Sequence, residues 1–459
     1  MTGMNIISPP FIYPIPPEKV KPSLPDFPLS EDVDRFIYLM QLVSEGLAKR
    51  KVSNPSKEFL NRLNFELEII DEKDYANYFL IVADLVRAAK EDFNLFVGPG
   101  RSSAAGSLVC YCLGITDVDP TKHGLLFERF ISPDRLILPD IDIDIEEGGK
   151  DILIQYMKDK YGDDHVTHII TYAMKENRGR IEERTIIGHG IHACGVAVSK
   201  LPMSDYTPLT KVDDTIVTVY DGHCIEDAGP VKFDILDFKV LEQIHRIQDY
   251  IKADMDNGFD VSHIPADDQA TFDAFHRGET EGIFMFEPAA IKKCLRIMHS
   301  VSFCDLVALN TMYRPGLMDY IPDFIARKNG QSKIEYALPC MEKYLSETYG
   351  MLIYQEQLML LIQNIAGLRR ADSDILRKAF AKKKDEVLNE MRPRFVQGGM
   401  ANGYSESTLK SLWDQWYVDA RYCFNKSHAV CYTKLAYQMM YLKVHFPKEF
   451  HTVMNESNF

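Results

Sequence analysis

Residues 139–145, Pro-Asp-Ile-Asp-Ile-Asp-Ile, constrain this chain more than any other segment, because aspartate alternates with isoleucine along their length. Successive side chains of a β-strand point to opposite faces, so Asp140, Asp142 and Asp144 would share one face of a strand. Aspartate is rare in strands, and neighbouring carboxylates repel each other. Oxygen ligands that converge on one side neutralise a divalent cation such as Mg²⁺ or Mn²⁺, so the pattern predicts a metal site.

Two other structures would also place aspartates at every second position: a calcium-binding loop and a solvated acidic strand edge. The calcium loop D-x-[DN]-x-[DN]-G requires a glycine where this chain has Ile145 or, counted from the second aspartate, Glu147. That loop is therefore excluded. The flanking isoleucines favour a buried strand over a loop, and the solvated edge stays open as the alternative.

The composition is that of a globular protein with a reducing, cytoplasmic location. The 459 residues are 46% hydrophobic and 26% charged, which is enough for two or three cores. No apolar run approaches the roughly 20 residues of a membrane helix, and the proline-rich start does not resemble a signal peptide. Nine cysteines without a C-x-x-C pair indicate neither a zinc site nor a disulfide framework. The net charge of −15 argues against a broadly basic surface for nucleic acid, although a local basic groove remains compatible with it.

A loop rich in glycine and serine, residues 98–107, lies a short distance before the aspartates. It follows a short strand predicted over 95–97 and runs into a helix predicted over 108–113. Small residues let backbone amides approach an anion, and Arg101 and the serine hydroxyls add donors for a phosphate. The loop does not have the G-x-x-x-x-G-K-[ST] pattern of a P-loop. An ordinary turn is the alternative interpretation.

The apolar patterns predict an α+β region followed by a largely helical one. Predicted strands cover 140–145, 166–172, 190–199, 215–220 and 231–236, and predicted helices cover 56–70, 76–90 and 151–161. On the last of these strands Lys232 and Asp234 share a face, either as part of a site or as a chance pair. The expected organisation is a proline-rich, loosely held lead-in over 1–30, an α+β domain over 31–255 and a helical domain over 256–459.

The helical part contains a basic patch and a polar cluster. Arg377, Lys378, Lys382 and Lys384 form the patch, which is either a solvated helix face or a binding surface for phosphates. His428 follows asparagine, lysine and serine, a combination too polar for a core alone, and a helix-capping or loop-bracing role is the simplest interpretation.

Taken together, the motifs resemble the C-family of bacterial replicative DNA polymerases, the alpha subunits of DNA polymerase III. The resemblance covers most of residues 30–450, with the motifs in the family's order. It rests on 97–107 (VGPGRSSAAGS), 126–130 (LFERF), 139–144 (PDIDID), 192–196 (HACGV), 232–234 (KFD), 313–316 (YRPG), 354–357 (YQEQ) and 424–429 (FNKSHA).

The resemblance implies a palm related to polymerase beta nucleotidyltransferases, a mixed sheet with helices, followed by helical fingers. Asp140, Asp142 and Asp234 are expected to hold two Mg²⁺ ions, with Mn²⁺ as a substitute, and a helper role for Asp144 stays open. Nucleotide binding is expected from the remaining candidate residues. These are Gly100, Arg101, Ser102, Ser103, Lys232, Arg377, Lys382, Lys384 and His428.

The resemblance also implies what this chain lacks. Family members begin with a phosphoesterase-like domain and continue into C-terminal modules, and neither is expected here. The family carries a thumb between 174 and 190, and the interval near 176–189 is short in this chain. Because the thumb grips the primer-template duplex, the expectation is a palm-and-fingers core that is trimmed or naturally reduced.

The expected function is templated DNA synthesis, in which dNMP is added to a primer 3′-hydroxyl with release of pyrophosphate. The alternative is a core that binds Mg²⁺-dNTP without gripping primer-template, and a metal-dependent nuclease is a less favoured third. Expected partners are primer-template DNA and dNTPs and, in a full-length relative, the sliding clamp, the clamp loader and the proofreading exonuclease. The expected location is the bacterial cytoplasm, in association with the nucleoid, and no membrane contact is expected.

Overall fold

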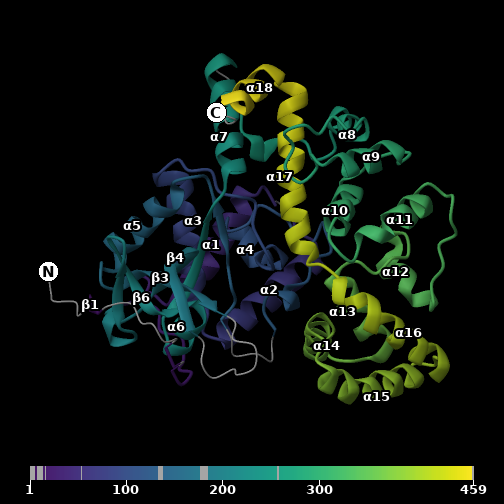
Figure 1. Cartoon of the computed structure of the whole chain (residues 1–459), viewed down its shortest axis with the longest axis horizontal. Coiled ribbons are helices and arrows are strands. Elements are labelled where there is room, and N and C mark those ends of the chain that lie inside the picture. Colours follow the sequence, from purple (N-terminus) through teal and green to yellow (C-terminus); the bar gives the residue numbers. More distant parts are fainter. Residues whose placement is uncertain are drawn as a thin grey trace. The chain divides into compact units, whose positions relative to one another are not determined.

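The computed structural model of the chain describes residues 6–7, 14–15, 17–52, 54–132, 138–175, 185–255 and 258–456 (Figure 1). It divides into two compact units. The sheet unit comprises Met1–Gly98, Cys112–Ile115 and Leu138–Glu242, and the helical unit comprises Pro99–Tyr111, Thr116–Ile137 and Gln243–Phe459. Each unit is described by itself below.

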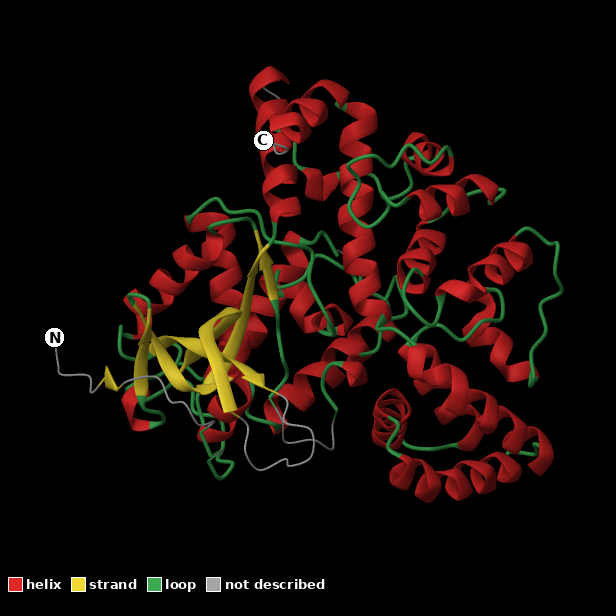
Figure 2. Cartoon of the chain, in the orientation of Figure 1, coloured by secondary structure: helices red, strands yellow, loops and turns green. Residues whose placement is uncertain are grey.

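Within the described residues, the sheet has seven strands in the order β1-β5-β6-β3-β4-β7-β2 (Figure 2). β3/β4, β4/β7 and β5/β6 are antiparallel, whereas β1/β5, β3/β6 and β2/β7 are parallel. The strands are β1 (Ile6–Ile7), β2 (Ile143–Ile145), β3 (Val166–Lys175), β4 (Thr185–Val198), β5 (Leu209–Val212), β6 (Thr215–Asp221) and β7 (Val231–Asp237).

Helices accompany this mixed sheet and form nearly all the regular structure of the helical unit. Those of the sheet unit are α1 (Arg35–Lys49), α2 (Lys57–Glu72), α3 (Ala76–Arg87), α5 (Gly149–Tyr161) and α6 (Gly222–Ala228). The others, which lie wholly or mostly in the helical unit, are α4 (Leu108–Cys112), α7 (Lys239–Met255), α8 (Gln269–His276), α9 (Ala289–Ile297), α10 (Phe303–Met312), α11 (Ile321–Lys328), α12 (Glu342–Leu345), α13 (Gln355–Ala366), α14 (Arg370–Lys382), α15 (Asp385–Ala401), α16 (Glu406–Asp419), α17 (Lys426–His445) and α18 (Pro447–Glu456).

The expected fold class, α+β with a mixed sheet followed by a helical region, is confirmed. Several predicted boundaries were wrong. The aspartate strand covers only Ile143–Ile145, because the Ile141 N–H is bound by the Tyr78 hydroxyl rather than by a neighbouring strand. Residues 95–97 contribute one isolated bridge, between Val97 and Ile145.

Residues 17–30 of the lead-in, which the structure describes, form no helix or strand, and they are held firmly rather than loosely. The Val20 N–H donates to the Asp227 carbonyl at 3.0 Å. The Asn77 side chain accepts from the Phe27 N–H at 2.8 Å and donates to the Pro25 carbonyl at 2.9 Å. The expected shortened thumb near 176–189 stays a prediction, because residues 176–184 lie outside the described part of the chain.

The helical unit is organised around α10 and α17. Asn310 of α10 donates to the Thr433 hydroxyl of α17 at 3.2 Å, which bonds the two buried helices to each other. A capping box starts α10: the Ser302 hydroxyl accepts from the Asp305 N–H, and the Asp305 carboxylate accepts from the Ser302 N–H. A separate aromatic core lies among α14, α15 and α16, where Trp413 packs against phenylalanines of the first two helices.

Across the described residues, we find no helix that combines the length and the apolar character needed to cross a membrane.

Candidate functional site

Strand β7 presents two charged side chains on one face. Its burial alternates, with Val231, Phe233 and Ile235 buried and the residues between them partly exposed. Lys232 and Asp234 therefore share a face, as the sequence predicts, and the Lys232 ammonium donates to Asp234 Oδ2. Burial is the largest single effect and opposes the charge of Lys232, but the bond to Asp234 and the negative charges of Asp234, Asp140 and Glu226 together raise the lysine pKa.

The carboxylates of Asp140, Asp142 and Asp234 converge beside this pair. One oxygen from each lies within 4.8 Å of the others. Asp140 and Asp142 precede β2, and β2 runs parallel to β7, so both segments enter the same corner of the sheet. An all-oxygen donor set of this kind is what Mg²⁺ and Mn²⁺ prefer.

The electrostatics of the cluster favour binding of a cation. Burial and repulsion from Asp142 raise the pKa of Asp140 to about 7, and Lys232 offsets this only in part. Asp140 is nevertheless exposed to solvent. Repulsion from the neighbouring carboxylates therefore contributes to its raised pKa in addition to burial. Asp234 Oδ1 is buried and has no hydrogen-bond partner. A divalent cation would satisfy that oxygen and relieve the repulsion, so the residues present fit a Mg²⁺ centre.

Asp144 is not part of this cluster, although the alternation of the sequence placed it with the others. Its side chain is only 2% exposed. All three residues of β2 are buried, so this strand has no solvent face that alternation could separate from a core face. The Gly98 N–H donates to the Asp144 carbonyl at 2.8 Å, and a Cβ at Gly98 would lie 3.1 Å from the Asp144 Cβ. Asp144 therefore packs closely against Gly98.

The sequence did not identify Tyr78 of α3 as a site residue, because it lies in an apolar stripe typical of a helix core. Its ring packs on Phe233 with the centroids 5.7 Å apart. Its hydroxyl accepts from the N–H of Ile141, the residue between Asp140 and Asp142, at 3.1 Å. Tyr78 thus positions the two aspartates that precede β2.

Replacing Tyr78 by phenylalanine is expected to lower the free energy of unfolding of the sheet unit by about 1–3 kcal/mol, because the buried Ile141 N–H loses its acceptor. We also expect weaker Mg²⁺ binding, since the aspartates on either side lose their anchor. Denaturant unfolding followed by circular dichroism and a Mg²⁺ titration measure the two effects. Tyr250→Phe, at a partly exposed tyrosine, is the control, and equal effects in the two variants would contradict a positioning role.

The loop after Gly98 belongs to the helical unit and is tightly fixed there. Gly100 has φ +122°, and a Cβ at this position would lie 2.9 Å from the Thr116 side chain, so glycine is required. Ser102 also has a positive φ, of 52°, and its N–H donates to His428 Nδ1 at 3.4 Å. The predicted helix after the loop is short, Leu108–Cys112, and Ser107 Oγ caps it by accepting from the Cys110 N–H.

His428 faces this loop from α17, whereas its neighbours in sequence serve the fold. Asn425 caps the helix, and the Lys426 ammonium binds Glu347 at 2.8 Å. Burial and the positive charges of Arg101 and Arg314 lower the pKa of His428 to about 4. The imidazole is therefore neutral near pH 7, and its Nδ1 is free of a proton to accept the bond from Ser102.

Arg314, in the 313–316 motif, is a second residue that the sequence does not identify as part of the site. Its guanidinium stacks on the Phe424 ring, 3.4 Å from the centroid, and its Nε is buried without a hydrogen-bond partner. Gly316 allows the turn: it has φ +96°, and a Cβ there would lie 2.2 Å from the Tyr422 ring. Arg101, Arg314 and the neutral His428 thus form a positively charged patch, as the effect of both arginines on the histidine pKa indicates.

The predicted basic patch of the fingers divides in two. Arg377 is only 6% exposed, binds Asp374 through Nε and Nη2 at 2.9 and 2.7 Å, and donates to Gln355 at 3.2 Å. This is a correction: a buried, paired guanidinium supports the packing of α13 on α14 and does not present itself to a nucleotide. Lys382 and Lys384 are exposed at the end of α14 and remain candidates.

Comparison with known proteins gives one consistent result. A family model described as the bacterial DNA polymerase III alpha NTPase domain matches residues 37–185 and 183–237, and one described as the bacterial DNA polymerase III alpha subunit finger domain matches 240–403. The DNA polymerase III alpha subunit of Staphylococcus aureus (strain COL) is 36% identical over 93% of this chain, and that of Staphylococcus epidermidis (strain ATCC 12228) is 35% identical over the same share. The chain spans 45% of the length of these relatives.

Proposed function

The chain belongs to the family of the bacterial DNA polymerase III alpha subunit, and from that premise we propose that it is the palm-and-fingers core of a DNA-directed DNA polymerase. The reaction adds dNMP to a primer 3′-hydroxyl and releases pyrophosphate. The observation that carries the proposal is the convergence of Asp140, Asp142 and Asp234 around a buried, unpartnered carboxylate oxygen. On this proposal the palm covers 31–255 and the fingers 256–459, and the match of the finger-domain model to residues 240–403 supports the second assignment.

The aspartates would hold two Mg²⁺ ions, for which Mn²⁺ could substitute. When bound, such ions supply Lewis-acid activation of the attacking hydroxyl and charge neutralisation of the leaving pyrophosphate. The chain's own residues set the geometry. Tyr78 anchors the backbone between Asp140 and Asp142, and Lys232 holds Asp234 in place through Oδ2, whereas Oδ1 has no hydrogen-bond partner.

The loop patch would bind the triphosphate. We propose that Arg314 contacts its oxygens, because a guanidinium with an unpartnered N–H is a strong donor to phosphate. Arg101 would add a second positive charge to the same patch. The rigid turn at Gly100, Ser102 and Ser103 would add amide and hydroxyl donors, with His428 bracing the turn. Lys232, Lys382 and Lys384 are further proposed nucleotide-binding residues, as the resemblance implies.

Replacing Arg314 by alanine is expected to weaken Mg²⁺-dNTP binding by about 10- to 100-fold, because a charge-assisted hydrogen bond contributes about 1.5–3 kcal/mol and 1.4 kcal/mol corresponds to a factor of ten. Arg314→Lys keeps the charge but loses the fork of donors and should recover only part of the affinity. Titration with a fluorescent dNTP measures both. Lys410→Ala, at an exposed lysine of α16, is the control, and an unchanged affinity in Arg314→Ala would remove this residue from the site.

The test of the proposed function is extension of a labelled primer-template in the presence of Mg²⁺. Extension that depends on the templating base supports a polymerase core. Release of mononucleotides from the DNA, without synthesis, would instead indicate a nuclease that uses the same aspartates.

One observation favours a second candidate, a core that binds Mg²⁺-dNTP without catalysis. The family model matches in two segments, 37–185 and 183–237, which overlap at residues 183–185, within the interval where the resemblance predicts a shortened thumb. Tight dNTP binding with negligible affinity for duplex across a range of salt would support this candidate. We further propose that the sliding clamp, the clamp loader and the exonuclease are partners of a full-length relative, and that the location is the bacterial cytoplasm at the nucleoid.

A further inference from the structure

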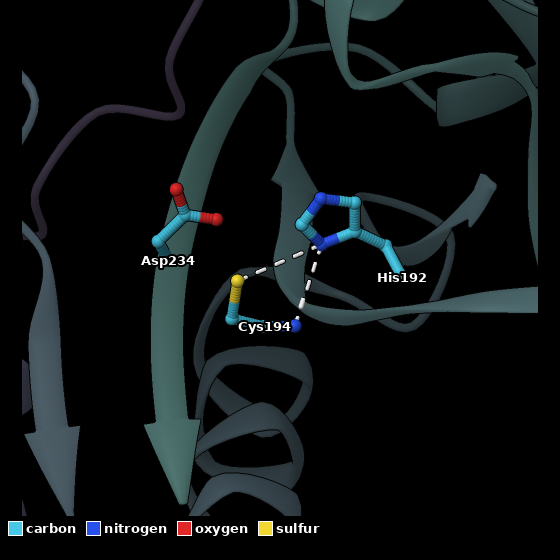
Figure 3. A group of neighbouring side chains, drawn as sticks. All are labelled: His192, Cys194 and Asp234. Atoms are coloured by element: carbon cyan, nitrogen blue, oxygen red, sulfur yellow. Dashed lines mark hydrogen bonds between the residues drawn. The ribbon is translucent and has the colours of Figure 1, made fainter. Parts of the chain in front are cut away.

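A second group of metal-ligand atoms lies beside the carboxylate cluster, and it contains nitrogen and sulfur. It comprises His192, Cys194 and Asp234, and one ligand atom from each lies within 4.8 Å of the others (Figure 3). Figure 3 shows the imidazole and the thiol on one side and the Asp234 carboxylate across from them. Asp234 belongs to both groups. Cysteine spacing gave no sign of this site, because two of its residues lie on β4 and the third on β7.

Glycine at position 195 lets the His192 ring lie against the backbone of β4, opposite the carboxylate. Gly195 pairs directly with Asp234 across β4 and β7. A Cβ at Gly195 would lie 2.8 Å from His192 Nδ1. The part of β4 between the histidine and the cysteine is held by Lys150, whose ammonium donates to the Ala193 carbonyl at 2.6 Å.

The ligand atoms are in a state suited to a cation. The Gly195 N–H donates to His192 Nδ1 at 2.7 Å, so this nitrogen carries a lone pair rather than a proton. Cys194 Sγ lies 3.7 Å from the same nitrogen. Asp234 Oδ2 is taken by Lys232, whereas Oδ1 is buried without a hydrogen-bond partner. A carboxylate with one unpartnered oxygen therefore belongs to the same group as a thiol and an unprotonated imidazole.

We propose that His192, Cys194 and Asp234 bind a borderline-soft divalent cation, Zn²⁺, and that the bound ion withdraws Asp234 from the Mg²⁺ centre. Thiolate, imidazole and carboxylate are the ligands of Zn²⁺, and three protein ligands leave a fourth position for water. Mg²⁺ does not compete for the nitrogen and sulfur because it prefers oxygen. Zn²⁺ would thus inhibit through a site of its own that shares one carboxylate with the catalytic ions. This second part rests on the proposed function.

Binding changes two bonds within the site. The Cys194 S–H bond breaks, its proton passes to solvent, and a zinc–sulfur bond forms. The lone pair of His192 Nδ1 exchanges the Gly195 N–H for the cation. No oxidation or reduction takes place.

Co²⁺ is the probe for the site, because a thiolate ligand gives cobalt a charge-transfer band in the near ultraviolet. We expect the full chain to show this band and Zn²⁺ to abolish it. Cys194→Ser should remove the band, and His192→Gln should weaken Co²⁺ binding by more than about 10-fold, since even residues that only orient a ligand change metal affinity by about 10- to 100-fold. Cys304→Ala, at an exposed cysteine outside the cluster, is the control that keeps the band.

Persistence of the band in a folded Cys194→Ser chain would overturn the site. If that variant does not fold, as judged by circular dichroism, the His192→Gln chain decides the matter, and unchanged Co²⁺ affinity there overturns the site as well.

Competition for Asp234 is tested by inhibition of Mg²⁺-dependent primer extension. Inhibition should require at least about tenfold more Zn²⁺ in Cys194→Ser than in the parent, because even residues that only orient a ligand change metal affinity by about 10- to 100-fold. Equal inhibition of the two proteins would contradict the shared carboxylate. A parent that gives the cobalt band but extends no primer would count against the proposed function while leaving the zinc site in place.

Discussion

Replacing Asp142 by asparagine is expected to reduce Mg²⁺-dependent primer extension by at least about 100-fold, because residues that only orient a metal ligand already change metal affinity or activity by about 10- to 100-fold. Asparagine keeps the shape of the side chain and removes the charge that a cation requires. Asp234→Asn should act in the same way, since its carboxylate joins the same cluster. Single-turnover extension rates, measured across a range of Mg²⁺ concentrations, give the size of the loss.

Glu147→Gln is the matched control for both variants. Glu147 is an exposed carboxylate that follows the cluster closely in sequence without belonging to it, so its loss should leave extension unchanged. Mg²⁺-dependent dNTP binding gives a second measurement that does not require a gripped primer, and Asp142→Asn should lose it too. If Asp142→Asn and Glu147→Gln behaved alike in both measurements, the assignment of the metal ligands would be wrong.

The largest expected effect on stability comes from Asp305, which is buried in the helical unit. Its carboxylate accepts from the Lys328 ammonium at 2.9 Å, from the Tyr349 hydroxyl at 3.0 Å and from the Ser302 hydroxyl at 2.6 Å. Asp305 and Lys328 are 2% and 9% exposed at the side chain. Asp305→Ala would leave a buried ammonium without its counter-ion, and we expect this to lower the free energy of unfolding by about 3–5 kcal/mol.

Tryptophan fluorescence can follow this loss in the helical unit alone, because the two tryptophans of the chain, Trp413 and Trp416, both lie in it. The control is Asp323→Ala, which breaks a more exposed ion pair with Arg327 in α11 and should cost less than about 1 kcal/mol. Equal midpoints of denaturant unfolding in the two variants would show that the buried pair contributes no more than the surface pair does.

The sequence predicted correctly those parts of the site where alternating residues lie on a regular β-strand. Lys232 and Asp234 share a face because β7 is a regular strand with one buried side. The same rule groups Asp144 with the other aspartates, yet its ligand atoms lie outside the cluster. The strand β2 is short and buried on both faces, and the aspartates before it are held by a tyrosine side chain rather than by a ladder. The alternation of residues along the chain cannot show that the hydroxyl of Tyr78 will accept a hydrogen bond from the Ile141 N–H.

Charge was the less informative signal. The basic patch after residue 376 contains one guanidinium that is paired with Asp374, three residues earlier, and two exposed ammonium groups. These three are all basic residues in the sequence, and only the packing of the structure distinguishes the buried, paired one from the exposed ones. Arg314 was missed for a related reason: the environment that leaves its Nε unpartnered is made by Phe424, which lies far along the chain.

The division into two units has a consequence for any attempt to dissect the protein. Residues 99–111 and 116–137 belong to the helical unit, although the rest of that unit starts at Gln243. A polypeptide beginning there would lack Arg129, which donates to Gln355 at 2.9 Å, and Glu128, which pairs with Arg370. Neither unit is therefore one contiguous stretch of the chain, and an expression fragment that starts at Gln243 leaves out part of the helical unit.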